Sequence, residues 1–256
     1  MDLHLKDKVF VISGGAKGIG KSISTILSEE GAIAVLLDKD EAAGNSFIKQ
    51  FPRSHFISVD LNDAFATQKA VELIDKKFGR IDGLVNNAGF NDDIGLEKGT
   101  PQKFLQSLNS NTSHFYNLAH YCLPALKNSK GSIVNISSKV AITGQGNTSG
   151  YAAAKGAILS LTREWAVELL PFSIRVNAVI PAQVLTPLYE YWLSTYPDPA
   201  KKKKEIEDMI PLGARMTSPD EIASTVVFLL SDRSSHTTGE WVYVDGGYVH
   251  LNRVLS

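Results

Sequence analysis

Tyr151 and Lys155 stand four residues apart in the stretch 151–157, whose small residues favour a helix. One helical turn places their side chains on the same face. An ammonium group there stabilises a tyrosinate, which predicts a Tyr151 pKa below the ordinary phenol value of about 10 and makes Tyr151 a usable general base. By itself such a pair is more often an exposed helical pair than an active site, so this chemistry requires further groups.

Ser138 and Asn111 are the further groups. Ser138 follows the predicted strand 133–137, and residues that leave the carboxyl edge of an open parallel sheet line its ligand crevice. Its hydroxyl is expected to hold a substrate oxygen beside Tyr151. Asn111 lies in a long helical segment, where its side chain is expected to bend the helix, hold a water and pass protons from Lys155 toward solvent, unless it reflects ordinary helix polarity. This predicted catalytic set requires no metal.

A glycine-rich loop follows the first predicted strand and opens a helix-forming stretch that runs to Glu30. Its glycines permit a tight turn and a close backbone approach, and a helix N-terminus offers free N–H groups and a positive dipole to a pyrophosphate. The residues expected to contact a cofactor here are Gly14, Lys17, Gly18, Ile19 and Gly20. A strand-to-helix turn without a ligand is the alternative, because such a loop alone is a modest signal.

Asp38 closes the second predicted strand, where a carboxylate accepts hydrogen bonds from the adenosine ribose and repels a 2′-phosphate. This favours NAD over NADP as the cofactor, although Lys17 and Lys39 soften the preference. The predicted reaction is therefore that of an oxidoreductase. Tyr151 exchanges a proton with the substrate oxygen, while a nicotinamide exchanges a hydride with the adjoining carbon.

Asp60 and Leu61 follow the third predicted strand, at the place where the adenine ring would lie. We include both among the expected cofactor contacts. A helix N-cap formed by Asn62 or Asp63 explains the local pattern equally well.

Short β-branched or apolar runs alternate with longer stretches of helical period. The runs are Val9–Ser13, Ala32–Asp38, His55–Val59, Gly83–Asn86, Ser132–Ile136, Ile174–Val179 and Trp241–Val244. Because they are almost continuously apolar, they are typical of strands buried on both faces of a parallel sheet. The chain is thus expected to fold as a single doubly wound α/β domain over residues 1–256, with helices on both faces. The proline-interrupted segment 182–211 is expected to form a helical lid.

The composition excludes several classes of partner. Acidic and basic residues are dispersed, and the formal net charge is -1, so we expect no nucleic-acid partner. The run Lys201–Lys204 is interpreted as a solvated helical face. Cys122 is the single cysteine and is expected to be a small core residue. With no signal peptide and no membrane-length apolar run, the expected location is cytoplasmic.

Several of these motifs, in this order and across almost the whole chain, resemble the short-chain dehydrogenase/reductase family. They are Gly14-x-x-x-Gly18-x-Gly20, the turn Asn86-Asn87-Ala88-Gly89, Asn111, Ser138 and Tyr151-x-x-x-Lys155. The resemblance implies a seven-stranded parallel sheet of Rossmann type and a catalytic tetrad at Asn111, Ser138, Tyr151 and Lys155. It also implies that Asn87, Ala88 and Gly89 approach the cofactor ribose and that Lys155 hydrogen-bonds the nicotinamide ribose.

The chain departs from the family pattern after Val179-Ile180-Pro181, where Ala182 replaces the usual glycine. A methyl group there narrows the backbone freedom near the nicotinamide. We still expect Pro181, Val184 and Thr186 to wall or anchor the nicotinamide, together with Ile180.

The segments expected to surround the substrate are hydrophilic. Their candidate substrate residues are Asn91, Asp93, Lys139, Gln145, Asn147 and Gln183. A polyol needs paired donors and acceptors, because buried unmatched polar groups are costly, so a sugar fits these segments best. The alternative is that these residues only form loops.

Within the family, the segments 87–96, 143–151 and 235–241 resemble bacterial L-fucose dehydrogenases. That resemblance implies oxidation of the anomeric hydroxyl of L-fucose, or of a related aldose, to a lactone. Alternatives are a 3-oxoacyl-carrier-protein reductase, against which Asp38 argues, another alcohol or ketone dehydrogenase of the family, and a non-catalytic nucleotide-sensing protein. A non-catalytic nucleotide-sensing protein has little reason to retain all four catalytic residue types.

The helix that carries Tyr151 is also expected to serve assembly. Ala152, Ala153, Ala157 and Ser160 leave a smooth surface on it, although ordinary packing on the sheet explains them too. The family resemblance implies a homotetramer or homodimer built partly on this helix. It also implies a C-terminal tail that crosses to a neighbour, where His250, Asn252 and Arg253 would complete a pocket.

Overall fold

A seven-stranded sheet forms the centre of the structure, a computed structural model that describes residues 2–251. The strand order is β3-β2-β1-β4-β5-β6-β7, and every adjacent pair is parallel. The strands are β1 (Val9–Ser13), β2 (Ile33–Asp38), β3 (His55–Ser58), β4 (Gly83–Asn86), β5 (Ser132–Ile136), β6 (Arg175–Pro181) and β7 (Trp241–Val244). The prediction of a seven-stranded, Rossmann-type parallel sheet is confirmed.

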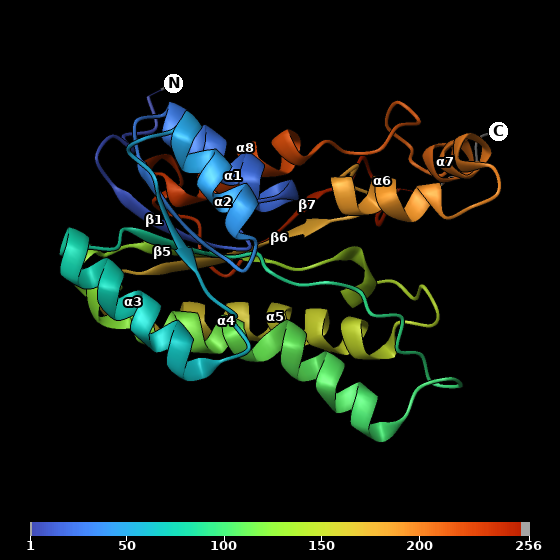
Figure 1. Cartoon of the computed structure of the whole chain (residues 1–256), viewed down its shortest axis with the longest axis horizontal. Helices are drawn as coiled ribbons and strands as arrows, with labels where there is room; N and C mark the ends of the chain where they lie inside the picture. The colour runs from blue at the N-terminus through green and yellow to red at the C-terminus, as the bar shows by residue number, and fades with distance from the viewer. Residues whose placement is uncertain (1, 252–256) are drawn as a thin grey trace.

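Helices cover both faces of the sheet (Figure 1). On one side lie α1 (Gly18–Glu29), α2 (Glu41–Gln50) and α8 (Pro219–Leu230), and on the other α3 (Ala64–Phe78), α4 (Pro101–Ser129) and α5 (Ser149–Glu168). Alternate residues of β1 divide between the two apolar clusters: Val9 and Val11 join the α3–α5 side, whereas Phe10 and Ile12 join the α1 and α8 side. This two-sided burial explains why the strands are almost continuously apolar.

The strand order reverses at β1, which pairs with β2 on one side and with β4 on the other. At such a switch point the connecting helices leave toward opposite faces, and a crevice opens beyond the carboxyl ends of the strands. The segments that begin at Gly14, Asn87 and Ser137, after β1, β4 and β5, all lie at this edge. The fold therefore collects the predicted motifs at one end of the sheet.

The segment 182–211, which we predicted as a lid, contains α6 (Pro187–Ser194) and α7 (Pro199–Glu207). Both lie beyond one end of the sheet (Figure 1). A small apolar cluster of Leu193, Ile206, Ile210 and Met216 holds them together. A β-bridge between Val184 and Thr217 joins the start of the segment to the chain that leaves it.

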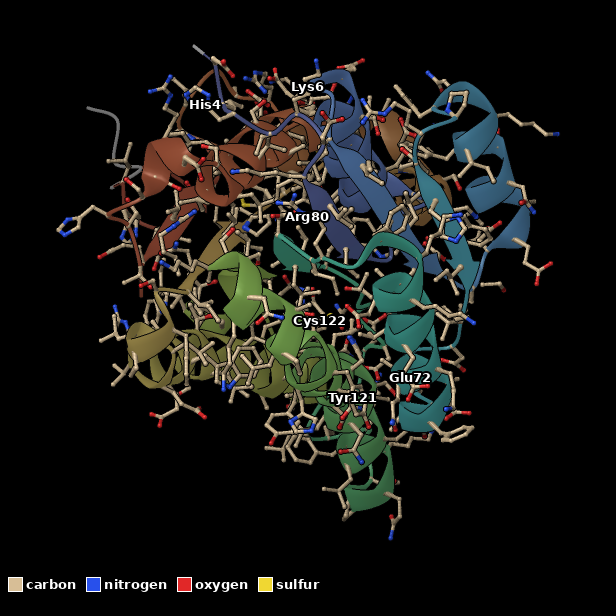
Figure 2. All side chains as sticks on the ribbon, turned by 90° about the vertical axis from the view of Figure 1, so that its left-hand side faces the viewer. His4, Lys6, Glu72, Arg80, Tyr121 and Cys122 are labelled. Atoms are coloured by element: carbon tan, nitrogen blue, oxygen red, sulfur yellow. The ribbon has the colours of Figure 1, made fainter. Side chains whose placement is uncertain are left out.

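Two surface and core assignments can be followed in the structure. On α7, Lys202 pairs with Glu205 at 3.4 Å and Lys203 with Glu207 at 3.7 Å, as expected for a solvated helical face. Cys122, labelled on α4 in Figure 2, is fully buried, and burial raises the pKa of its thiol to about 12.

Across residues 2–251 no helix combines the length and the apolar character that crossing a bilayer requires.

Candidate active site

The glycine-rich loop forms a cradle between β1 and α1. Gly14 and Gly18 have φ values of 63° and 52°, in the left-handed region that glycine tolerates best. A Cβ on Gly20 would lie 2.1 Å from the Gly14 carbonyl oxygen, so the turn closes only around glycine. Lys17 precedes α1 without a side-chain cap, and the first turn of the helix carries no acidic residue. Free N–H groups and an open dipole thus fit a pyrophosphate.

Asp38 ends β2 beside this loop. Its carboxylate accepts hydrogen bonds from the backbone N–H groups of Ala16 and Asp40, each at 3.1 Å. Lys17 is held by an ion pair and hydrogen bond with Asp40, and the pKa of Lys17 is raised first by Asp40 and more weakly by Asp38. Lys17, one of the two lysines expected to soften the preference for NAD, is therefore paired with a neighbouring carboxylate.

Asp60 and Leu61 follow β3 as expected, with Asp60 exposed and Leu61 buried. The Asp60 carboxylate accepts hydrogen bonds from the backbone and side chain of Asn62 at 3.0 and 3.1 Å. Asp63, rather than Asn62, caps α3 by accepting from Phe65 N and Ala66 N. The N-cap interpretation is thus correct for Asp63, and it leaves the adenine position of Asp60 and Leu61 as a prediction.

The Asn86–Gly89 turn is tied to the end of β1. Asn87 Nδ2 donates to Ser13 O at 2.9 Å and to Gly14 O at 3.3 Å, and Ser13 Oγ accepts from the N–H groups of Asn87 and Ala88. The turn is also tied to β5, because Asn86 Nδ2 donates to Asn135 Oδ1 at 3.0 Å. These bonds hold the turn against the glycine-rich loop.

Asn111 is fully buried in α4. Its Oδ1 accepts from Phe90 N at 2.9 Å, and its Nδ2 donates to Ser107 O at 3.0 Å, one turn earlier in the helix. A Cβ on Gly89 would lie 3.1 Å from Asn111 Oδ1 and 3.4 Å from Lys155 Nζ. Asn111 Oδ1 and Lys155 Nζ therefore both lie close to Gly89, and the Asn111 amide anchors the segment after β4 to α4.

Tyr151 and Lys155 lie on α5, and Ser138 directly precedes a short 3-10 helix, η1 (Lys139–Ala141). Lys155 Nζ donates to Ile136 O at 2.8 Å and lies 5.6 Å from the centre of the Tyr151 ring. Ser137 Oγ donates to Lys155 O at 2.8 Å, which docks α5 on the end of β5. A hydrogen bond joins the Ser138 and Tyr151 side chains.

The pKa values differ from the prediction made for Tyr151. Burial raises the pKa of Tyr151 to about 12, and the hydrogen bond with Ser138 only opposes this. Burial also lowers the pKa of Lys155 to about 7. The expected lowering of the phenol pKa by Lys155 is therefore wrong for the protein alone, because desolvation disfavours the charged forms of both residues, and only Ser138 opposes the rise in the pKa of Tyr151.

The segment after β6 closes over the glycine-rich loop. A Cβ on Gly18 would lie 3.5 Å from Thr186 Cγ2, and Pro181 and Val184 are buried. Thr186 caps α6 by accepting from Tyr189 N at 3.2 Å. Ala182 is not among the residues of the described chain with a left-handed φ, so its departure from glycine is accommodated without backbone strain.

The candidate substrate residues fall into two groups. Asn91, Asp93, Gln145 and Asn147 are exposed on two loops, which pack together through a hydrogen bond from Gly150 N to Ile94 O at 3.2 Å.

Of the remaining two candidates, Lys139 is buried and Gln183 is half-buried. Lys139 is buried, with 6 % of its surface exposed, and Gln183 Oε1 accepts from Tyr189 Oη at 2.8 Å.

Asp92, which the sequence places with Asn91 and Asp93 in the hydrophilic segment after β4, accepts a hydrogen bond from Ser107 Oγ at 2.8 Å. Sequence reasoning missed Tyr248, which contacts Lys139 through its hydroxyl at 3.4 Å and through its ring. The glycine pair before Tyr248 was the one sequence signal for a turn there. His250, expected to reach a neighbour's pocket, packs its ring on Tyr243 at 4.2 Å, while Asn252 and Arg253 lie outside the described residues.

The parallel sheet, the glycine cradle and the Asn111-Ser138-Tyr151-Lys155 set are those of a short-chain dehydrogenase/reductase. Residues 14–249 match the family described as "Enoyl-(Acyl carrier protein) reductase". The chain belongs to the short-chain dehydrogenase/reductase family, whose members are oxidoreductases that act on CH–OH groups with NAD(P) and are commonly oligomeric.

Relatives named for different substrates match over almost the whole chain. L-fucose dehydrogenase of Bos taurus is 36% identical over 96% of this chain and 91% of its own length. The 3-oxoacyl-[acyl-carrier-protein] reductase FabG of Thermotoga maritima is 35% identical over 96% of this chain and 100% of its own.

Two solved structures superpose closely. Cj0485 dehydrogenase has a TM-score of 0.97 and 44% identity, covering 100% of this chain and 99% of its own. Thermoplasma acidophilum aldohexose dehydrogenase has a TM-score of 0.92 and 30% identity, with the same coverage.

Proposed function

We propose that this enzyme oxidises L-fucose, or a related aldose, at the anomeric carbon to the lactone, with NAD as the hydride acceptor. The observation that carries the proposal is the convergence of Ser138, Tyr151 and Lys155 at the end of β5, with a buried, polar Lys139 directly beside them. The names of two similar proteins, an L-fucose dehydrogenase and an aldohexose dehydrogenase, support a sugar as the substrate.

In the proposed mechanism, the Ser138 hydroxyl and the Tyr151 phenol hold the anomeric hydroxyl of the sugar. Tyr151 takes its proton as the general base. When bound, NAD would supply the acceptor for the hydride and a positive charge. A positive charge near the phenol would favour the phenolate and so counter the burial that raises the pKa of Tyr151 to about 12 in the protein alone.

The other two catalytic candidates position this base. Lys155 bonds to Ile136 O, which fixes its ammonium against the end of β5 and toward the expected ribose. Asn111 anchors the segment after β4 by accepting from Phe90 N. We propose that the Asn111 side chain also holds a water that passes protons from Lys155 toward solvent.

We propose NAD rather than NADP because Asp38 places a carboxylate at the end of β2, where a 2′-phosphate would meet its charge. Gly14, Lys17, Gly18, Ile19 and Gly20 would hold the pyrophosphate. Asn87, Ala88 and Gly89 would border the ribose, with Pro181, Val184 and Thr186 around the nicotinamide.

The proposal is tested by incubating the pure enzyme with NAD or NADP and a panel of aldoses, following reduced cofactor by its absorbance. We expect turnover with L-fucose or a close relative, a lactone as product, and higher kcat/KM with NAD. No turnover on any aldose, together with reduction of 3-oxoacyl thioesters, would establish the second candidate instead.

That second candidate, a 3-oxoacyl-carrier-protein reductase, has specific support. FabG of Thermotoga maritima is almost as similar as the sugar dehydrogenase, and the matching family description names an acyl-carrier-protein enzyme. Asp38 argues against it, because such a reductase is expected to prefer NADP. A nucleotide-sensing protein is disfavoured since all four catalytic residue types are present.

The remaining expectations belong to the same proposal. We propose that the enzyme acts in the cytoplasm, as one domain, and assembles as a homodimer or homotetramer partly through α5. Size-exclusion chromatography with light scattering tests the assembly, and a monomer at working concentration would contradict it.

A further inference from the structure

Lys139 directly follows Ser138, and its side chain is buried with few partners. Only 6 % of the residue is exposed. Its Nζ lies 3.4 Å from the Tyr248 hydroxyl and 4.5 Å from the centre of the Tyr248 ring. None of the ion pairs among residues 2–251 includes Lys139. A lysine ammonium carries three donor hydrogens, so one long hydrogen bond leaves most of its capacity unused.

Stability does not explain a lysine in this position. A buried charge loses its hydration, and a cation–π contact with a single ring only partly offsets that loss. Buried polar groups that lack partners in the protein alone are typical of sites where a ligand completes the hydrogen bonds. The Lys139 ammonium is therefore better explained as a donor to a bound molecule.

The surroundings of Tyr248 place this ammonium at the substrate side of Ser138. Tyr248 packs against the apolar cluster that holds α6 and α7. Tyr189, from the same cluster, donates through its hydroxyl to Gln183 Oε1. Lys139 thus lies where the end of β5, the segment 182–211 and the C-terminal segment meet. A substrate whose reacting oxygen is held by Ser138 has to occupy this junction.

Tyr248 is itself held in place by a turn after β7. The buried Asp245 carboxylate accepts from Gly247 N at 2.8 Å and from Val249 N at 2.9 Å. Gly246 and Gly247 have φ values of 63° and 82°, which glycine adopts without strain. The turn therefore presents Tyr248 to Lys139 in a fixed position rather than on a loose tail.

We infer that Lys139 is a specificity-determining residue that donates a hydrogen bond to a second hydroxyl of the substrate, and that Tyr248 positions its ammonium. This inference rests on the proposed sugar oxidation and assigns the selection of the sugar to Lys139. A substrate with one oxygen leaves the buried ammonium with only its long hydrogen bond to the Tyr248 hydroxyl among the described residues. A site built to bind a hydroxyl strongly rejects analogues that lack it. The pair thereby favours polyhydroxylated substrates over simple alcohols and ketones.

The test compares wild type, Lys139→Met, Lys139→Arg and Tyr248→Phe on L-fucose and on its 2-, 3- and 4-deoxy derivatives, with NAD in excess. For wild type, we expect one deoxy sugar to lose about 10- to 100-fold in kcat/KM. Lys139→Met should lose a similar factor on L-fucose and show no further loss on that deoxy sugar. Tyr248→Phe should raise KM for L-fucose about 3- to 10-fold with kcat nearly unchanged, and Lys139→Arg should recover part of the loss.

The KM for NAD and the melting temperature serve as controls. A merely structural role for Lys139 would lower the melting temperature and reduce activity equally on all four sugars, and that result would overturn the inference. Wild-type enzyme without turnover on any aldose would reject the proposed function and the inference with it. Turnover by wild type with an unchanged sugar profile in Lys139→Met would reject the inference alone.

Discussion

Replacing Gly20 with alanine is expected to damage the cofactor cradle directly. The new Cβ would lie 2.1 Å from the Gly14 carbonyl oxygen and 2.7 Å from Asn87 Nδ2. Both neighbours are held: the oxygen belongs to the backbone of the turn, and the amide donates to Ser13 O at 2.9 Å and to Gly14 O at 3.3 Å. The turn must therefore open by about 1 Å to restore an ordinary contact.

The magnitude follows from three contributions. Overpacking of this kind costs about 1–3 kcal/mol, and the loss of the two Asn87 hydrogen bonds adds about 2 kcal/mol. The alanine recovers about 1 kcal/mol, since Gly20 lies inside α1. We expect a net loss of about 2–4 kcal/mol in the free energy of unfolding, which a domain of this size survives. Because the N–H groups move, the affinity for NADH should fall at least about tenfold.

Urea unfolding and titration of NADH fluorescence measure the two effects. Gly144→Ala is the matched control, because a Cβ there meets nothing within 4 Å and Gly144 is outside the set of glycines with left-handed φ. It should leave both quantities unchanged. NADH binding by Gly20→Ala within twofold of wild type, at equal stability, would refute the cradle geometry.

Three further predictions concern charge. Asp38→Asn should lower kcat/KM for NAD about 10- to 100-fold and raise the NADP-to-NAD ratio; an unchanged ratio in steady-state assays would contradict the role of this carboxylate. Burial lowers the pKa of His114 from 6.5 to about 4. The buried neutral imidazole therefore costs no stability above pH 6.5, and about 3 kcal/mol of the free energy of unfolding is lost as pH falls from 6.5 to 4. His114→Gln should reduce that loss in urea unfolding at pH 7 and 4.5, and equal losses in both proteins would exclude the effect. Burial lowers the pKa of Lys155 from 10.5 to about 7, which destabilises the fold fully below pH 7 and progressively less as pH rises to 10.5. Lys155→Met should therefore be more stable by about 3–5 kcal/mol at pH 6, with the gain fading toward pH 10; a constant gain would show that packing, not charge, is responsible.

The sheet was predictable because its strands are short, β-branched and apolar on both faces. The largest boundary error is at β6, which extends to Pro181 where the sequence suggested an end at Val179. Pro181 pairs with Val244 of β7, and a proline at the end of a strand gives up only a hydrogen-bond donor. That pairing depends on a strand some sixty residues away, which local patterns do not reveal.

The site was predictable where it depends on local spacing or on the carboxyl ends of strands. Lys155 reaches Tyr151 within one helical turn, and the crossover from β5 brings Ser138 to both. Burial was not predictable in the same way, and the pKa of Tyr151 was therefore assigned the wrong direction. Tyr248 was missed because it meets Lys139 across 109 positions of sequence, through a tail whose path is set only by tertiary packing.

The proton chemistry of Tyr151 is the central claim, and Tyr151→Phe tests it most directly because it keeps the ring while removing the acid–base group. NADH binding by fluorescence and turnover with the best aldose are measured on the same preparation. We predict that NADH binds with nearly wild-type affinity while kcat falls at least about 100- to 10,000-fold, the range that general acid–base catalysis provides. Turnover within tenfold of wild type at undiminished NADH affinity would contradict the account.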